Sequence, residues 1–272
     1  MVLYPLNSAP PETSPPSTTS AWEAVARKQK EAATAWWLVA QPDHAALAGD
    51  LAASIQSADF PELDAEVVQA ITLHDAGWAA FDGGDARGAG GAPLAQARTP
   101  HLTHSGRPLS FLDMALGDFL RAWTASIERA VEVAPVGGIM VSEHFSRLAA
   151  MRLSMNLDRE EDAAKMREFV RGEVERRKTL AKDDPHRESG RSVLVDVLQF
   201  CDLLSLYLCC GSKDSVEFPQ RFNGRTIRLW RVGEMGQTEP ALFGRGLSLG
   251  VRARRYPSSG ETPSITIPFL LA

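Results

Sequence analysis

The stretch VLVDVLQFCDLLSLYLCC, residues 193–210, is the most apolar part of the chain. It is long enough to suggest a membrane span, but it contains Asp196, Gln199 and Asp202. A carboxylate at the centre of a bilayer costs about 2.5–3.5 kcal/mol. We therefore predict that this segment is the buried central helix of a soluble helical protein. Asp202, in the middle of that helix, needs a partner, because an unpaired buried carboxylate is costly and tends to take up a proton.

Five further segments have the apolar spacing of helices that bury one face. In one of them Leu47, Leu51 and Ile55 recur at four-residue intervals. Another carries many charges and a single narrow apolar stripe, so we expect it to lie on the outside of the molecule. The predicted helices cover residues 44–55, 61–78, 110–133, 135–155 and 158–182, the last being the charged one.

The two ends of the chain differ from this helical region. Residues 7–20 are rich in Pro, Ser and Thr and have too few apolar residues to repay ordering. Residues 35–40, AWWLVA, predict either a short strand or the lead into a helix. Beyond residue 211, apolar runs between Gly and Pro breaks predict three strands, at residues 226–232, 247–254 and 264–270. We therefore predict a mainly α fold, with an N-terminal tail (1–34), a helical bundle (35–210) and a small β-rich C-terminal extension (211–272).

Composition narrows the range of partners. The chain has 272 residues with 29 basic and 34 acidic side chains, a net charge of -5, so it has no bulk attraction to nucleic acid or to an anionic membrane. Its three cysteines lie in one apolar segment, at 201, 209 and 210, without the CxxC spacing of a zinc ribbon. Residues 1–20 lack the basic and apolar regions of a secretory signal. We expect a cytoplasmic protein with reduced cysteines, and neither a nucleic-acid nor a membrane partner.

Histidine and aspartate residues on the predicted helices suggest a metal site. His74 and Asp75 are adjacent on the apolar side of one helix, His44 opens the preceding helix, and His144 lies within a later one. A divalent cation would relieve the cost of burying Asp202 and binds such a mixture of imidazole and carboxylate. The alternative for each histidine is a core or surface side chain that merely hydrogen-bonds a backbone carbonyl.

The order His44, His74-Asp75, Asp202 resembles the H…HD…D signature of the HD-domain superfamily of metal-dependent phosphohydrolases. More closely, the chain resembles a bacterial family of proteins of unknown function, DUF3891. The segments that carry this resemblance are WWLVAQPDHAALAGDLA (36–52), HDAGWAAFD (74–82), GRPLSF (106–111), SEHFSRL (142–148) and DLLSLYLC (202–209). The resemblance implies an HD-like helical bundle in which His44, His74, Asp75 and Asp202 hold a metal. It also implies that His144 holds a second metal or contacts the leaving phosphate.

The resulting functional hypothesis is a metal-dependent phosphohydrolase acting on a phosphorylated small molecule, either a phosphate ester or a nucleotide. Its cofactor would be a divalent ion, with Mn, Fe, Ni, Mg and Zn all admissible. The expected catalytic residues are Asp75, Arg107 and His144, and the expected substrate contacts are Arg107, Arg147 and Trp78. Asp82 would orient a histidine.

Two alternatives belong to other classes. The first is a di-iron oxygenase, which the HD resemblance also admits, because some HD-like proteins hold two irons with six ligands. Here the ligands would be His44, His74, Asp75, His144, Asp202 and one of His101 or His104. Both lie in a long loop rich in Gly and Pro, residues 79–109, whose role is left open. The second is a non-catalytic domain that binds a metal, a ligand or a partner.

Overall fold

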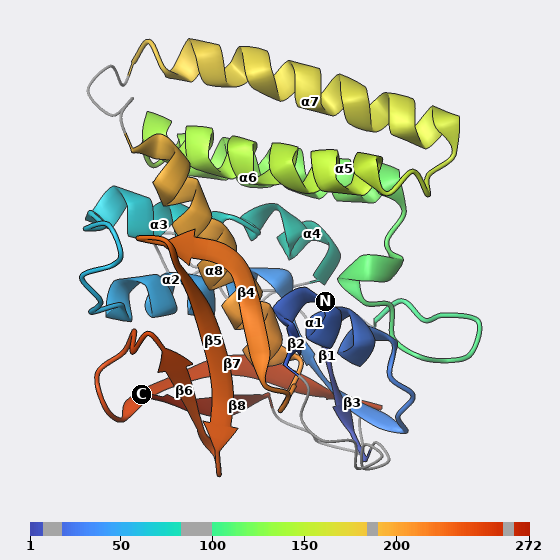
Figure 1. Ribbon diagram of the computed structural model, residues 1–272. Helices are drawn as coiled ribbons and strands as arrows, with labels where there is room; N and C mark the ends of the chain where they lie inside the picture. The colour runs from blue at the N-terminus through green and yellow to red at the C-terminus, as the bar shows by residue number, and fades with distance from the viewer. Residues whose placement is uncertain (8–17, 83–99, 184–189, 258–263) are drawn as a thin grey trace.

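The computed structural model describes residues 1–7, 18–82, 100–183, 190–257 and 264–272. Layers of helices are stacked over a curled, eight-stranded mixed sheet, and the helix farthest from the sheet is α7 (Figure 1). The prediction of a mainly α, HD-like bundle with a small β-rich extension is therefore wrong. The reason is that strands from both ends of the chain join one sheet, so the β structure is a full layer of the domain.

The sheet has the order β1-β3-β7-β8-β6-β5-β4-β2. Neighbouring strands are antiparallel except for the parallel pairs β6–β8 and β2–β4. Trp36 pairs with Tyr256, so the N-terminal strands join those at the C-terminal end directly. The strands are β1 (Val2–Leu6), β2 (Thr19–Ser20), β3 (Ala35–Val39), β4 (Val216–Phe222), β5 (Arg225–Val232), β6 (Met235–Glu239), β7 (Leu247–Tyr256) and β8 (Ile265–Leu271).

The predicted helices are present, but the one expected over residues 61–78 is interrupted. It spans Ala65–Leu73, and a 3₁₀ turn, Ala76–Trp78, follows, so the prediction that His74 and Asp75 lie on one continuous helix is wrong. Helix α3 begins at Ala65 because the Asp64 side chain accepts a hydrogen bond from Val67 N at 2.9 Å, which caps the first turn. The α-helices are α1 (Ala21–Lys30), α2 (Gln41–Ser54), α3 (Ala65–Leu73), α4 (Ala79–Asp82), α5 (Leu116–Val131), α6 (Pro135–Ser154), α7 (Glu160–Leu180) and α8 (Arg191–Cys209). Two short 3₁₀ helices, η1 (Ala76–Trp78) and η2 (Phe111–Asp113), complete the set among the described residues.

Helix α8 is the central element of the core. It is the one helix in the described part of the chain that is long and apolar enough to cross a membrane, and 67% of its most apolar window is buried. It packs against α2, α6, α1 and β4. Its side chains thus have protein neighbours on most sides, as in the core helix of a soluble protein, and this agrees with the prediction from residues 193–210.

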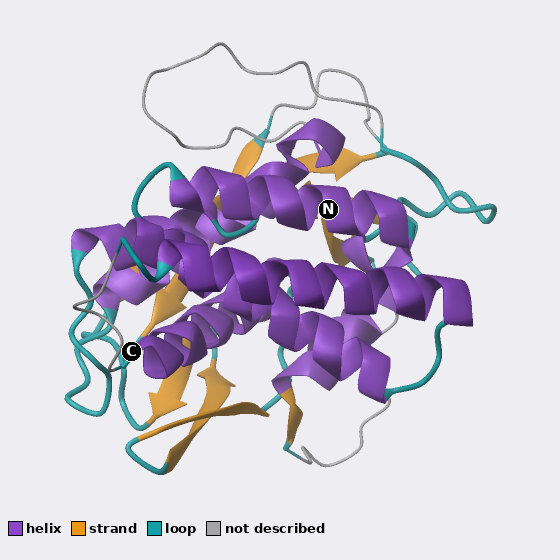
Figure 2. Ribbon diagram, turned by 90° about the horizontal axis from the view of Figure 1, so that it is seen from above, coloured by secondary structure: helices purple, strands orange, loops and turns teal. Residues whose placement is uncertain are grey.

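Parts of two predicted segments lie outside the described residues. These are residues 8–17 of the expected tail and residues 83–99 of the Gly-rich loop. The remainder of the expected tail contributes β1, β2 and α1 to the fold. Seen from above, the helical layers cover much of the sheet (Figure 2).

Candidate metal centre

The His74-Asp75 pair lies at a break between two helices. Helix α3 ends at Leu73, Asp75 leaves the helical conformation (φ −115°, ψ 21°), and a 3₁₀ turn follows. Gly77 holds this turn against α5, because its N–H donates to Ser126 Oγ at 2.9 Å. A Cβ on Gly77 would lie 2.1 Å from the carbonyl oxygen of Ala122, so the turn needs a glycine there. The break allows adjacent His and Asp side chains to point into one site.

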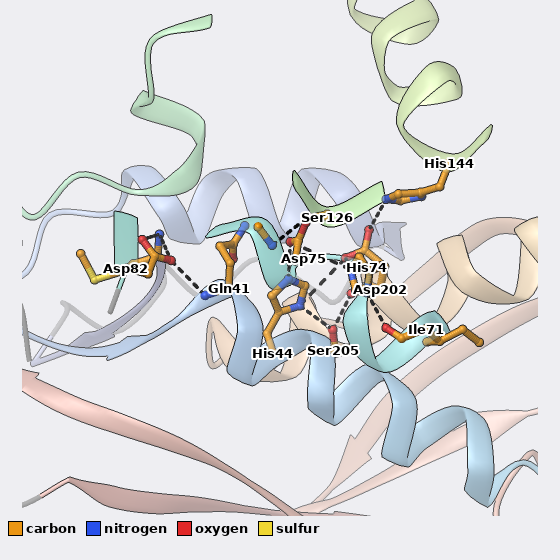
Figure 3. Close-up of polar contacts among 12 residues, drawn as sticks. Gln41, His44, Ile71, His74, Asp75, Asp82, Ser126, His144, Asp202 and Ser205 are labelled. Atoms are coloured by element: carbon orange, nitrogen blue, oxygen red, sulfur yellow. Dashed lines mark hydrogen bonds and ion pairs between the residues drawn. The ribbon is translucent and has the colours of Figure 1, made fainter. Parts of the chain in front are cut away.

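Five side chains from four parts of the fold meet at this break (Figure 3). His44 comes from α2, His144 from α6 and Asp202 from α8, and they join His74 and Asp75. The three histidines are at most 1% exposed. The potential ligand atoms of the five side chains form two overlapping triads, and the atoms of each triad all lie within 4.8 Å of one another. The triads are His44–His74–Asp75 and His74–His144–Asp202. We call these five residues the His/Asp cluster.

The tautomer of His44 follows from its neighbours. The Ser205 hydroxyl donates its proton to the backbone oxygen of Asp202 at 2.8 Å. It can therefore only accept from His44 Nδ1, which lies 2.8 Å away, so Nδ1 carries a proton. In neutral His44 the lone pair is then on Nε2, which lies 2.9 Å from Asp75 Oδ2. Two acceptors at this distance need a proton or a metal ion between them.

His74 has the same arrangement. Its Nδ1 donates to the carbonyl oxygen of Ile71 at 2.7 Å, and a carbonyl can only accept. Its Nε2 faces Asp202 Oδ1 at 3.3 Å. Burial lowers the pKa of His74, but the carboxylates of Asp75 and Asp202 outweigh this effect and raise the pKa to about 9. In the absence of a metal ion, a proton therefore occupies the space between His74 and Asp202.

His144 and Asp202 complete the second triad. His144 Nε2 lies 3.7 Å from Asp202 Oδ2, and its Nδ1 is buried without a partner among the described residues. Burial lowers the pKa of His144 to about 4, so this imidazole is neutral at pH 7. Burial alone would raise the pKa of Asp202, but the hydrogen bond and charge of His74 lower it to about 2. The centre thus offers an ionised carboxylate and a neutral imidazole at neutral pH.

The His/Asp cluster borders a cavity of about 580 Å³. Asp75, His144 and Asp202 line it, whereas most of the other lining residues are apolar or aromatic. Trp78, expected from the sequence to contact the substrate, is 1% exposed and is one of the residues that line the cavity.

Several residues predicted to take part lie elsewhere. Arg107 bonds the Gln29 carbonyl oxygen and Asp113, outside the cavity. Arg147 bonds Glu143, Asp196, Gln199 and Ser192 and joins α6 to α8. Asp82 accepts hydrogen bonds from the backbone nitrogen of Gln41 and from the Met1 amino group, so it orients neither His44 nor His74. His101 and His104 are exposed and do not join the cluster.

Two groups that position the histidines were not identified from the sequence. Ser205 fixes His44, and it lies one helical turn after Asp202, a spacing that places both on one side of α8. The backbone carbonyl of Ile71 fixes His74. The sequence cannot indicate this contact, because a residue of any type supplies that oxygen.

These observations fit a divalent cation. Metal-bound histidines commonly donate their second ring nitrogen to a carbonyl or another acceptor, which keeps the ligating nitrogen unprotonated. His44 and His74 both do so. Three imidazoles and two carboxylates are a donor set suited to Mn, Fe, Ni or Zn and less suited to Mg, which prefers oxygen.

Comparison with known proteins places the chain in a family. No curated protein and no solved structure matches it. No match supports the HD-domain resemblance. The profile of one family, described as "Protein of unknown function (DUF3891)", matches residues 28–255, which include β3, all five cluster residues and most of the C-terminal strands. The chain therefore belongs to the family DUF3891.

Proposed function

We propose that this protein is a metal-dependent hydrolase of a phosphate ester. The observation that carries the proposal is the shared arrangement of His44 and His74. In each, Nδ1 is committed to a fixed acceptor, and Nε2 faces a carboxylate from a second element. Asp75, Asp202 and His144 would complete the ligand set, because their atoms lie in the same two triads.

A bound divalent ion would lower the pKa of a water molecule and polarise a phosphoryl oxygen. The chain supplies the groups around that chemistry. Asp75 borders the cavity and can accept a proton at its carboxylate. The buried Trp78 Nε1–H has no partner among the described residues, so it can donate to a substrate oxygen.

Elemental analysis tests the metal site directly. The protein is purified without chelator beside His74→Ala and Asp202→Asn, with His101→Ala as a matched control, because His101 is an exposed histidine outside the cluster. We expect one or two equivalents of a transition metal in the parent and the control, and a loss in both cluster variants. Hydrolysis of a chromogenic aryl phosphate should follow the metal content. A parent that takes up no Mn, Fe, Ni or Zn even after soaking would refute the proposal.

A second candidate, a di-iron oxygenase, is favoured by the five potential ligands of the His/Asp cluster and by the apolar cavity beside them. Its expected sixth ligand, His101 or His104, lies outside the cluster. This candidate requires two irons per chain and an absorption band in the visible region, which a hydrolase with one Mn or Zn lacks. Bound metal without either activity would instead indicate the non-catalytic alternative. We also place the protein in the cytoplasm, an inference supported by three free, buried cysteines.

A further inference from the structure

We infer that the substrate has a large apolar body and a single anionic end; this inference rests on the proposed function and specifies its substrate. The first observation is the wall of the cavity. Trp123 stacks on Phe145 with ring centroids 4.8 Å apart, and Phe119 packs edge-on against both Trp123 and Trp78 at 5.0 Å. All four rings line the cavity, so a ligand within it meets a continuous aromatic surface.

The charges around the cavity limit how much negative charge the ligand can carry. Among the described residues that line it, Arg152 is the one Lys or Arg. Its guanidinium is already engaged by Asp158, with three contacts of 2.7–3.2 Å to the two carboxylate oxygens. A polyphosphate needs several unengaged cations, and the described lining offers none. One anionic group held at the His/Asp cluster is what this lining can accommodate.

Two uncommitted polar atoms mark where the polar end would lie. Gln41 Oε1 and Trp78 Nε1 are buried and have no partner among the described residues, and both residues line the cavity beside Asp75. A buried polar atom without a partner costs free energy unless a ligand or water supplies one. Trp78 Nε1 offers a donor to the anionic head of a ligand whose body lies along the aromatic wall, and Gln41 Oε1 can accept from a protonated oxygen of that head.

The mouth of the cavity, where its lining is exposed, carries apolar side chains beside the Arg152–Asp158 ion pair. Leu157 is 83% exposed, Met155 is 48% exposed and Met151 is 42% exposed, and all three line the cavity. Large apolar side chains grouped at a cavity mouth indicate contact with an apolar ligand. The apolar path therefore runs from the aromatic wall to the outer surface, and a long apolar chain can follow it.

The test is a series of n-alkyl phosphonates, from butyl to decyl, with inorganic phosphate as the head group alone. Phosphonates are used because their P–C bond resists hydrolysis. Binding to the metal-loaded protein is followed by its intrinsic tryptophan fluorescence, because Trp22, Trp78 and Trp123 line the cavity. Each added methylene should tighten binding by about three- to fourfold while the chain still lies within the cavity. Equal affinity for butyl and decyl phosphonate would overturn the inference.

Substitutions at the mouth of the cavity test whether the alkyl chain binds there. Leu157→Gln combined with Met155→Gln should weaken decyl phosphonate by about fivefold or more and leave butyl phosphonate unchanged. The control is Val232→Gln, an exposed apolar residue that does not line the cavity. Equal loss in the control, or no loss in the double variant, would also overturn the inference.

The two proposals can fail separately. The alkyl series is repeated with metal-free protein and with uncharged alkyl alcohols. If the protein binds no metal but still prefers longer chains, the proposed hydrolase function is wrong and the apolar-body inference stands. If the protein binds metal and cleaves phosphate esters without any dependence on chain length, the function stands and the inference is wrong.

Discussion

Replacing Ser205 with alanine should lower the affinity for metal more than it lowers the stability of the metal-free fold. His44 is fully buried, and Ser205 Oγ is the acceptor for its Nδ1–H at 2.8 Å. The metal-bound form needs this tautomer, so Ser205→Ala leaves a buried N–H without a partner. That costs about 1–3 kcal/mol. In the metal-free form the proton can move to Nε2 and be donated to Asp75 Oδ2 at 2.9 Å, which reduces the loss.

Most of the cost therefore falls on metal affinity, which should drop by about 5- to 150-fold. The assay is competition with a fluorescent chelator for Zn²⁺ and Mn²⁺ at pH 7, beside urea unfolding in the presence of EDTA. Ser212→Ala is the control, since Ser212 is also fully buried and hydrogen-bonded, to Asp214, but contacts no cluster histidine. Unchanged metal affinity in Ser205→Ala, or an equal drop in Ser212→Ala, would refute the reasoning.

Four other predictions concern the protonation of His74 and the roles of Gly77 and Arg147. The raised pKa of His74, about 9, means that metal must displace its proton; affinity should rise with pH up to about 9 and then level off, and calorimetry in buffers of different ionisation enthalpy should detect the released proton. For the same reason the metal-free protein should lose stability as pH rises from 6.5 through 9, a loss that His74→Gln would not show in urea titrations. Gly77→Ala should destabilise the fold by about 1–3 kcal/mol, because the new methyl group meets the Ala122 carbonyl oxygen, and an unchanged urea midpoint would contradict this. Arg147→Met should lower stability, because the ion pair of Arg147 with Asp196 joins α6 to α8, yet leave the KM of a phosphate ester unchanged. A raised KM would restore Arg147 as a substrate contact.

The helices were predictable because each buries one face, and the apolar spacing within a single segment reports that face. Four strands of the sheet were missed because their own sequences lack an apolar pattern. One of them, β2, has only two residues, Thr19–Ser20. β1 and β4 are each interrupted by a proline, Pro5 and Pro219, and β6, MGQTE, has little apolar character. The pairing of β3 with β7 joins residues from opposite ends of the chain, and no local pattern reports such a contact.

The candidate site was predicted more fully than the fold around it. The structure brings His44, His74, Asp75, His144 and Asp202 together, although metal binding by them stays a prediction. The order of these residues along helices was the signal, aided by the family resemblance. The arginines could not be assigned in the same way, because long basic side chains find carboxylates or carbonyls at many surface positions.

The pairing of β3 with β7 also bears on how the protein is made. Trp36 leaves the ribosome long before Tyr256, its partner in the sheet. At about 5–20 residues per second, the gap between them corresponds to roughly 10–40 s of synthesis. Throughout that time the edge of β3 that does not pair with β1 has no neighbouring strand, and β3 carries the apolar Trp36 and Trp37. We therefore expect the nascent chain to rely on ribosome-associated chaperones until the last strands emerge.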